Sequence, residues 1–193
     1  VVALALAVLA CIAIPVLGLG GTDTAPAIAP ALAGILVVAI IGLGEATFRR
    51  PMTLTRSADL RPRRLGDLVP WGWLITAAGS LLALAAALVV GTLLGSADDL
   101  GRAGRAISVV CDGATHTRTP WPGSHYAAPI ALATTVSVLV AVATCLVVAR
   151  RPSPAAESTA LDTGLRRWSM AGVLQALTLV ACVTLVPVLL LMA

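Results

Sequence analysis

Two histidines and a cysteine lie close together in one polar segment of an otherwise apolar chain. Cys111, His116 and His125 fall within fifteen residues. Thiolate and imidazole groups are ligands that suit zinc or copper, so these residues, with Asp112 beside them, form a candidate metal site. Their spacing matches no strong metal-binding signature. The alternative chemistry is nucleophilic catalysis, with Cys111 as the thiolate and a histidine as its base.

The segment that carries these residues, 96–126, is also consistent with a lid that caps a helix bundle. Trp121 and Tyr126 would anchor the lid at the membrane boundary, where aromatic rings with one polar side accumulate. Ser96 and Asp99 have the spacing of a capping box, and Asp98 stands four residues before Arg102. Apolar residues then recur three or four apart, at Leu100, Ala103, Ile107 and Val110. This pattern predicts a short amphipathic helix on the outer membrane surface, weakened by two glycines.

The composition of the whole chain defines the class of protein that must hold this loop. Of its 193 residues, 59% are hydrophobic and 11% are charged. A soluble domain has about 45–50% apolar and about 25% charged residues, so a soluble protein and a disordered one are both excluded. The net charge is +4, and every cation is arginine. The composition therefore predicts an integral membrane protein.

Five apolar runs have about the length of 20 residues that a helix needs to cross the hydrocarbon core. Backbone groups in lipid must be satisfied internally, so we expect all five to be helices. They cover about residues 1–20, 27–44, 71–95, 127–149 and 168–192. The first run could instead be a secretory signal or carry a lipid on Cys11, although signal cores are shorter, about 7–15 residues. Because the first residue is Val, we expect the true start to lie upstream or to have been removed.

The arginines predict the orientation of these spans. Ten lie in the loops after the second and fourth spans, and three lie in the loop after the third, where acidic residues balance them. Arginine-rich loops stay in the cytoplasm. We therefore expect a plasma membrane protein with a cytoplasmic N-terminus and an extracytoplasmic C-terminus. The arginine-rich loops would meet anionic lipid headgroups, and they contain no nucleotide-binding motif.

Small residues recur at every fourth position in two spans, which predicts close helix packing. The third span carries Gly79, Ala83, Ala87, Gly91 and Gly95, and the fourth carries Ala133, Ser137, Ala141, Cys145 and Ala149. The stripes indicate packing within the chain or a seam with a partner chain. Gln175 is the only large polar side chain in a span, and we expect it to bond to another helix, for example to Thr134 or Thr135.

The spans contain no ionisable residue, and this limits the possible functions. Ion-coupled transporters, proton relays and voltage sensors need such groups at membrane depth. Haem held between helices needs a histidine there, and none is present. Glu45 stands at the end of the second span, next to Arg49 and Arg50, and we expect it to pair at the membrane boundary.

Three segments resemble those of an actinobacterial family of multispan, five-helix membrane proteins of unknown function. They are Asp98–Arg105, Thr119–Ser124 and, before the third span, Leu60–Leu65. The resemblance covers residues 56–170, but Leu68 stands where the pattern has an aromatic residue. It implies the multispan topology and an actinobacterial plasma membrane, and it implies no activity.

These observations predict one all-α transmembrane domain over residues 1–193, with five spans and an amphipathic helix in its outer loop. The favoured function is that of a non-catalytic accessory or scaffold subunit, with membrane lipids and other membrane subunits, or a second copy, as partners. No nucleic-acid partner and no cofactor is expected. A module that binds or transports a small molecule or metal at the outer loop, and an enzyme that uses Cys111, remain as alternatives.

Overall fold

Apolar runs of the chain form four long helices in the computed structural model, which describes residues 24–47, 65–151 and 159–193. All four are long and apolar enough to cross a membrane. They are α2 (Ala25–Ala46), α4 (Trp71–Leu94), α5 (Ser124–Arg150) and α6 (Thr159–Met192), and the one-turn helix α3 (Leu65–Leu68) precedes α4. A β-hairpin of β1 (Ile107–Cys111) and β2 (Ala114–Arg118) lies between α4 and α5.

Helices form at four of the five predicted spans, with bounds within a few residues of the predicted ones at most ends. Proline occupies the first turn of α2, where its missing N–H needs no partner. The predicted first span lies outside the described residues. The largest difference is at α6, which begins at Thr159 and not at Trp168. Its added turns hold Asp162 and Arg166, which pair four residues apart and support the helix beyond the apolar run.

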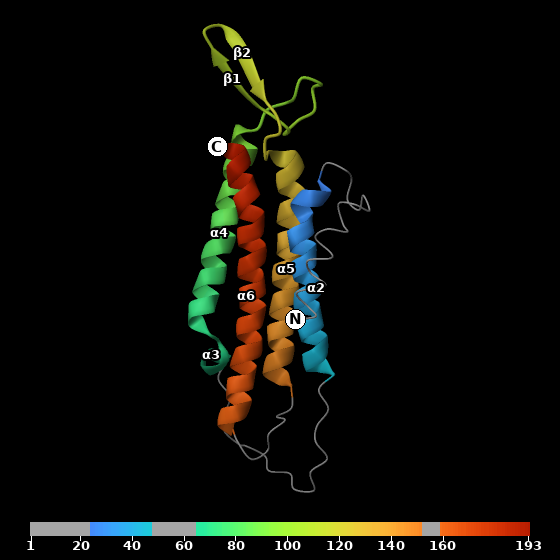
Figure 1. The fold of residues 1–193 in the computed structure, drawn as a ribbon, viewed down its shortest axis with the longest axis vertical. Helices are drawn as coiled ribbons and strands as arrows, with labels where there is room; N and C mark the ends of the chain where they lie inside the picture. The colour runs from blue at the N-terminus through green and yellow to red at the C-terminus, as the bar shows by residue number, and fades with distance from the viewer. Residues whose placement is uncertain (1–23, 48–64, 152–158) are drawn as a thin grey trace.

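Helices α2 and α5 run in one direction and α4 and α6 run in the opposite direction, and α5 and α6 form the centre of the bundle (Figure 1). Helix α2 packs on both of them from one side. Helix α4 packs on the other side, mainly against α6. The α2–α6 approach is close, because a Cβ atom added at Gly34 would collide with Val180. At the α2–α5 contact, the Ser137 hydroxyl donates to the carbonyl of Ala31 at 3.2 Å.

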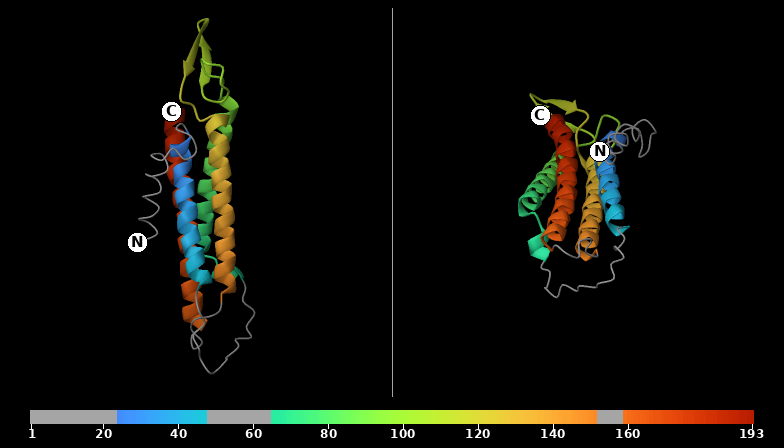
Figure 2. Two further views of the ribbon diagram at one scale, coloured as in Figure 1. Left: turned by 90° about the vertical axis from the view of Figure 1, so that its right-hand side faces the viewer. Right: turned by 60° about the horizontal axis from the view of Figure 1, so that its bottom comes forward.

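The two ends of the bundle differ in chemistry. The hairpin and the C-terminus lie at one end, which we call the hairpin end (Figures 1 and 2). The last residues of α2 and α5 and the first residues of α6 lie at the other end. We call this the arginine end, because Arg150, Arg151, Arg166 and Arg167 lie there. The expected opposition of the outer loop and the arginine-rich side therefore holds for the described residues.

The amphipathic helix expected in the outer loop is not formed, because turns and the first strand take its place. Gly101 and Gly104 have positive φ angles of 76° and 69°, which do not belong to a right-handed helix. The Asp98 carboxylate accepts the backbone N–H groups of Leu100 and Arg102, at 3.0 and 2.8 Å, and closes a turn. The expected Asp98–Arg102 ion pair does form, with 2.7 Å between Arg102 Nε and Asp98 Oδ2.

Candidate functional site

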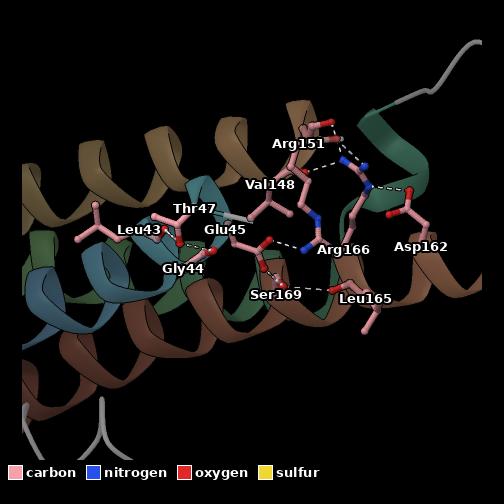
Figure 3. A network of polar contacts seen from close by, with 11 residues as sticks. Leu43, Gly44, Glu45, Thr47, Val148, Arg151, Asp162, Leu165, Arg166 and Ser169 are labelled. Carbon is pink, nitrogen blue, oxygen red and sulfur yellow. Dashed lines mark hydrogen bonds and ion pairs between the residues drawn. The ribbon is translucent and has the colours of Figure 1, made fainter. Parts of the chain in front are cut away.

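A buried ion pair joins three helices at the arginine end of the bundle. Glu45 stands in the last turn of α2, and its carboxylate pairs with the guanidinium of Arg151, the residue that directly follows α5. The Ser169 hydroxyl of α6 donates to Glu45 Oε1 at 2.6 Å (Figure 3). Buried polar groups require partners, because burial removes them from water. The three side chains therefore bond to one another across α2, α5 and α6.

A second charged side chain, Arg166 of α6, closes the end of α5. Only 1% of Arg166 is exposed. Its Nε donates to Asp162 at 3.0 Å, and Nη1 donates to the carbonyls of Val148 and Ala149 at 2.7 and 2.9 Å. Nη2 donates to the carbonyl of Arg151 at 2.7 Å (Figure 3). The last carbonyls of a helix lack intrahelical donors, and a cation there also interacts favourably with the negative end of the helix dipole. Arg166 thus acts as a cap supplied by a neighbouring helix.

This network gives Glu45 a partner from outside its own stretch of sequence. The sequence places Glu45 beside Arg49 and Arg50, which lie outside the described residues. In the structure its partner is Arg151, 106 positions further along the chain. Arg150 and Arg151 at the end of the fourth predicted span could have suggested a partner for Glu45, since the second and fourth predicted spans end on the same side of the membrane.

A cavity of about 460 Å³ opens beside this ion pair, between α2 and α6. Its polar lining consists of Glu45, Arg151, Ser169 and Gln175, and Trp168 stands at its edge. The remaining lining is apolar and comes from Ile40, Ile41, Leu165 and small residues. The cavity therefore offers a carboxylate, a guanidinium, a hydroxyl and an amide next to an aliphatic wall, which is a lining suited to an amphipathic molecule.

At the hairpin end, the loop closes over the bundle through Trp121. Its indole N–H donates to the carbonyl of Gly91 in α4 at 2.8 Å, and only 5% of the residue is exposed. Gly91 permits this approach, since a Cβ atom there would collide with the carbonyl oxygen of Pro122. Tyr126 packs against the apolar cluster beneath. The loop is thus held as a lid at these two aromatic positions.

The structure brings only part of the candidate metal site together. Cys111 and His116 are exposed on the same face of the hairpin, where their positions are diagonal neighbours across the strand pair. His125 lies instead in the first turn of α5 and stacks edge-on against Tyr126, with 4.9 Å between ring centroids. Asp112 forms the hairpin turn with a positive φ of 54°. Within the described residues no three His, Cys, Asp or Glu side chains are grouped to hold a metal ion.

The residues expected to pack helices divide into two groups. Ser137 and Ala141 are buried against α2 and the centre of the bundle, and Ala87 and Gly91 are buried on α4. Gly79 and Ala83 face outward, because α4 buries the side of the helix that carries Ala77 and Leu84. Gln175 is exposed on the cavity described above, and it is not placed between helices beside Thr134 or Thr135. No protein-family model, curated protein or solved structure matches the chain.

Proposed function

We propose that the protein is a non-catalytic accessory or scaffold subunit of a larger assembly in the plasma membrane. The apolar helices are those of a membrane-embedded protein. The ten arginines in the loops after the second and fourth predicted spans support a cytoplasmic location for the arginine end, and we infer that the hairpin lies outside the cell. The resemblance to actinobacterial multispan proteins supports a bacterial plasma membrane as the location.

The exposed β-hairpin carries this proposal. Every residue of its strands except Ile107 is exposed, and Val110 is 70% exposed. The sheet has two strands, so both of its outer edges leave N–H and C=O groups unpaired within the described chain. A two-stranded hairpin by itself has marginal stability in water. Its aliphatic side chains and unpaired strand edges offer a partner protein apolar contacts and backbone hydrogen bonds. The hairpin therefore has the form of a docking element for an extracytoplasmic partner.

The outward face of α4 supports the same function. Small residues at alternating spacings of three and four form one exposed stripe, which comprises Gly72, Thr76, Gly79, Ala83 and Ala86. A Cβ atom added at Gly72 or Gly79 would have nothing within 4 Å. In a bilayer, helices associate where small side chains let backbones approach closely. This face is thus suited to a helix of a neighbouring subunit.

Site-specific photo-crosslinking in the native membrane tests the proposal. A benzophenone amino acid is placed at Val110 of the hairpin, at Gly79 of α4 and, as a control, at Leu43, which is 65% exposed on α2. We expect discrete protein adducts at Val110 and Gly79 and none at Leu43. A particle that stays strictly monomeric in mild detergent, with no adduct at either test position, would overturn the proposal.

A metal-binding function of the outer loop is a second proposal, carried by the shared hairpin face of Cys111 and His116. One thiolate and one imidazole from one chain would be completed by a second copy or by His125 after rearrangement of the lid. Elemental analysis of the purified protein tests this function. Stoichiometric zinc or copper that is lost in a His116→Ala variant would support it, and absence of metal from the wild type would refute it.

A further inference from the structure

We propose that the cavity between α2 and α6 at the arginine end binds one phospholipid with a zwitterionic, amine-bearing headgroup, such as phosphatidylethanolamine. The cavity volume of about 460 Å³ is within the usual range of about 300–1,000 Å³ for small-molecule sites. Its lining is polar at the end of α2 and mostly apolar toward the middle of the helices, where Gln175 adds one amide. The proposal is independent of the accessory function.

The depth of the cavity matches the headgroup and glycerol region of a bilayer. Helix α2 has 22 residues and is about 33 Å long, close to the hydrocarbon thickness of about 30 Å. Glu45 stands one residue before its end, so the ion pair lies at the membrane boundary. Trp168 is 78% exposed at the same level, where indole rings prefer to lie. The cavity thus begins where lipid headgroups are found.

Gln175 adds a polar side chain to the cavity below the ion pair. It lies seven positions after Trp168, about 10 Å further into the membrane along α6. Its side chain is exposed and lines the cavity. An amide that faces hydrocarbon without a hydrogen bond is unfavourable. The ester carbonyls of a phospholipid, which lie just below its headgroup, can accept from this amide and remove that penalty.

The charges of the lining select the type of headgroup. One carboxylate, Glu45, and one guanidinium, Arg151, line the cavity, so its net charge is zero. A carboxylate has about four lone-pair positions, and the contacts with Arg151 and Ser169 leave room for an ammonium N–H to donate to Glu45. The exposed arginines Arg150 and Arg167 are not part of the lining. The site therefore favours a zwitterionic lipid over an anionic one.

Native mass spectrometry of the full chain, incubated with defined phosphatidylethanolamine or phosphatidylglycerol, tests the site. We expect the wild type to retain one phosphatidylethanolamine in preference to phosphatidylglycerol. Gln175→Leu removes one hydrogen bond and should weaken retention about tenfold. Glu45→Gln should abolish the preference between the two lipids.

Thr92→Val is the matched control, because Thr92 is an exposed polar residue of α4 whose hydroxyl bonds to its own helix at Leu88. We expect this variant to retain lipid as the wild type does, and circular dichroism checks that all variants keep their helix content. Three results would overturn the proposal. The first is that the wild type retains no lipid, as expected if another protein segment covers the cavity. The second is that the wild type retains phosphatidylglycerol in preference to phosphatidylethanolamine. The third is that Gln175→Leu and Thr92→Val retain lipid equally.

Discussion

Replacing Arg166 by alanine should destabilise the bundle more than any other single loss of charge at this end. The substitution leaves the Asp162 carboxylate, whose side chain is 5% exposed, without its cation. It also removes the donors of the Val148 and Ala149 carbonyls. Breaking a buried ion pair from one side costs about 3–5 kcal/mol, and each orphaned carbonyl about 1–3 kcal/mol.

These losses of free energy are not additive, because one side chain donates to all of the acceptors and the acceptor groups can rearrange together when it is removed. We therefore expect the free energy of unfolding to fall by about 3–5 kcal/mol, a large part of the total of about 5–15 kcal/mol that is typical of a folded domain. Equilibrium unfolding in detergent micelles, followed by far-ultraviolet circular dichroism, measures the difference.

Two further variants separate charge from capping. In the double variant Arg166→Met with Asp162→Leu, no buried charge is left alone and only the carbonyls lose donors, so the loss should shrink to about 1–3 kcal/mol. Arg167→Ala, on the exposed side of the same helix, should stay within about 0.5 kcal/mol of the wild type. Equal losses for Arg166→Ala and Arg167→Ala would refute the assignment of a capping role.

Three other predictions concern the hairpin end. Gly91→Ala should lower the free energy of unfolding by about 1–3 kcal/mol in the same measurement, because the added Cβ collides with a carbonyl of the lid. Gly79→Ala should not lower it. A greater loss for Gly79→Ala than for Gly91→Ala would contradict the packing. Trp121→Phe should cost about 0.5–1.5 kcal/mol for the lost bond to Gly91, seen as a lower unfolding temperature, and an unchanged temperature would count against it. Partial burial tends to raise the pKa of Asp98, but hydrogen bonds and the charge of Arg102 together hold it below 3.8. The ionised carboxylate therefore stabilises the turn at neutral pH, and this contribution is lost as the pH falls through the pKa of Asp98. In Arg102→Ala, the pKa of Asp98 measured by NMR titration should rise toward 3.8. A pKa of Asp98 equal to that in the wild type would contradict the role of Arg102.

The transmembrane helices could be predicted because length and hydropathy in lipid leave few alternatives. A run without ionisable residues must be a helix if it crosses the membrane, so α4 and α5 matched to within three residues at each end. The hairpin was missed because the apolar spacing of Leu100 to Val110 fits a helix as well as it fits a turn followed by a strand. The better signal was Asp112-Gly113, a pair typical of tight hairpin turns, beside the β-branched residues of β1.

The candidate site at the arginine end was much less accessible to sequence reasoning. Its charges were visible, but the partners of Glu45 come from two other helices, more than 100 residues away. The boundary at Trp168 also placed Arg166 in a loop, since an arginine at the start of a span is usually exposed. Helix α6 begins before its apolar run, and the carbonyls at the end of α5 make the burial of Arg166 favourable. Such complementarity depends on tertiary contact and leaves no local pattern.

The shared charges at the arginine end have a mechanical consequence for the bundle. Helices α2, α5 and α6 are fastened to one another there by Glu45, Arg151 and Arg166, whereas α4 contributes no side chain to this fastening among the described residues. Helix α4 is joined to these three mainly by apolar packing against α6. A partner bound to the hairpin would therefore act next to the described long helix that no ion pair joins to the others.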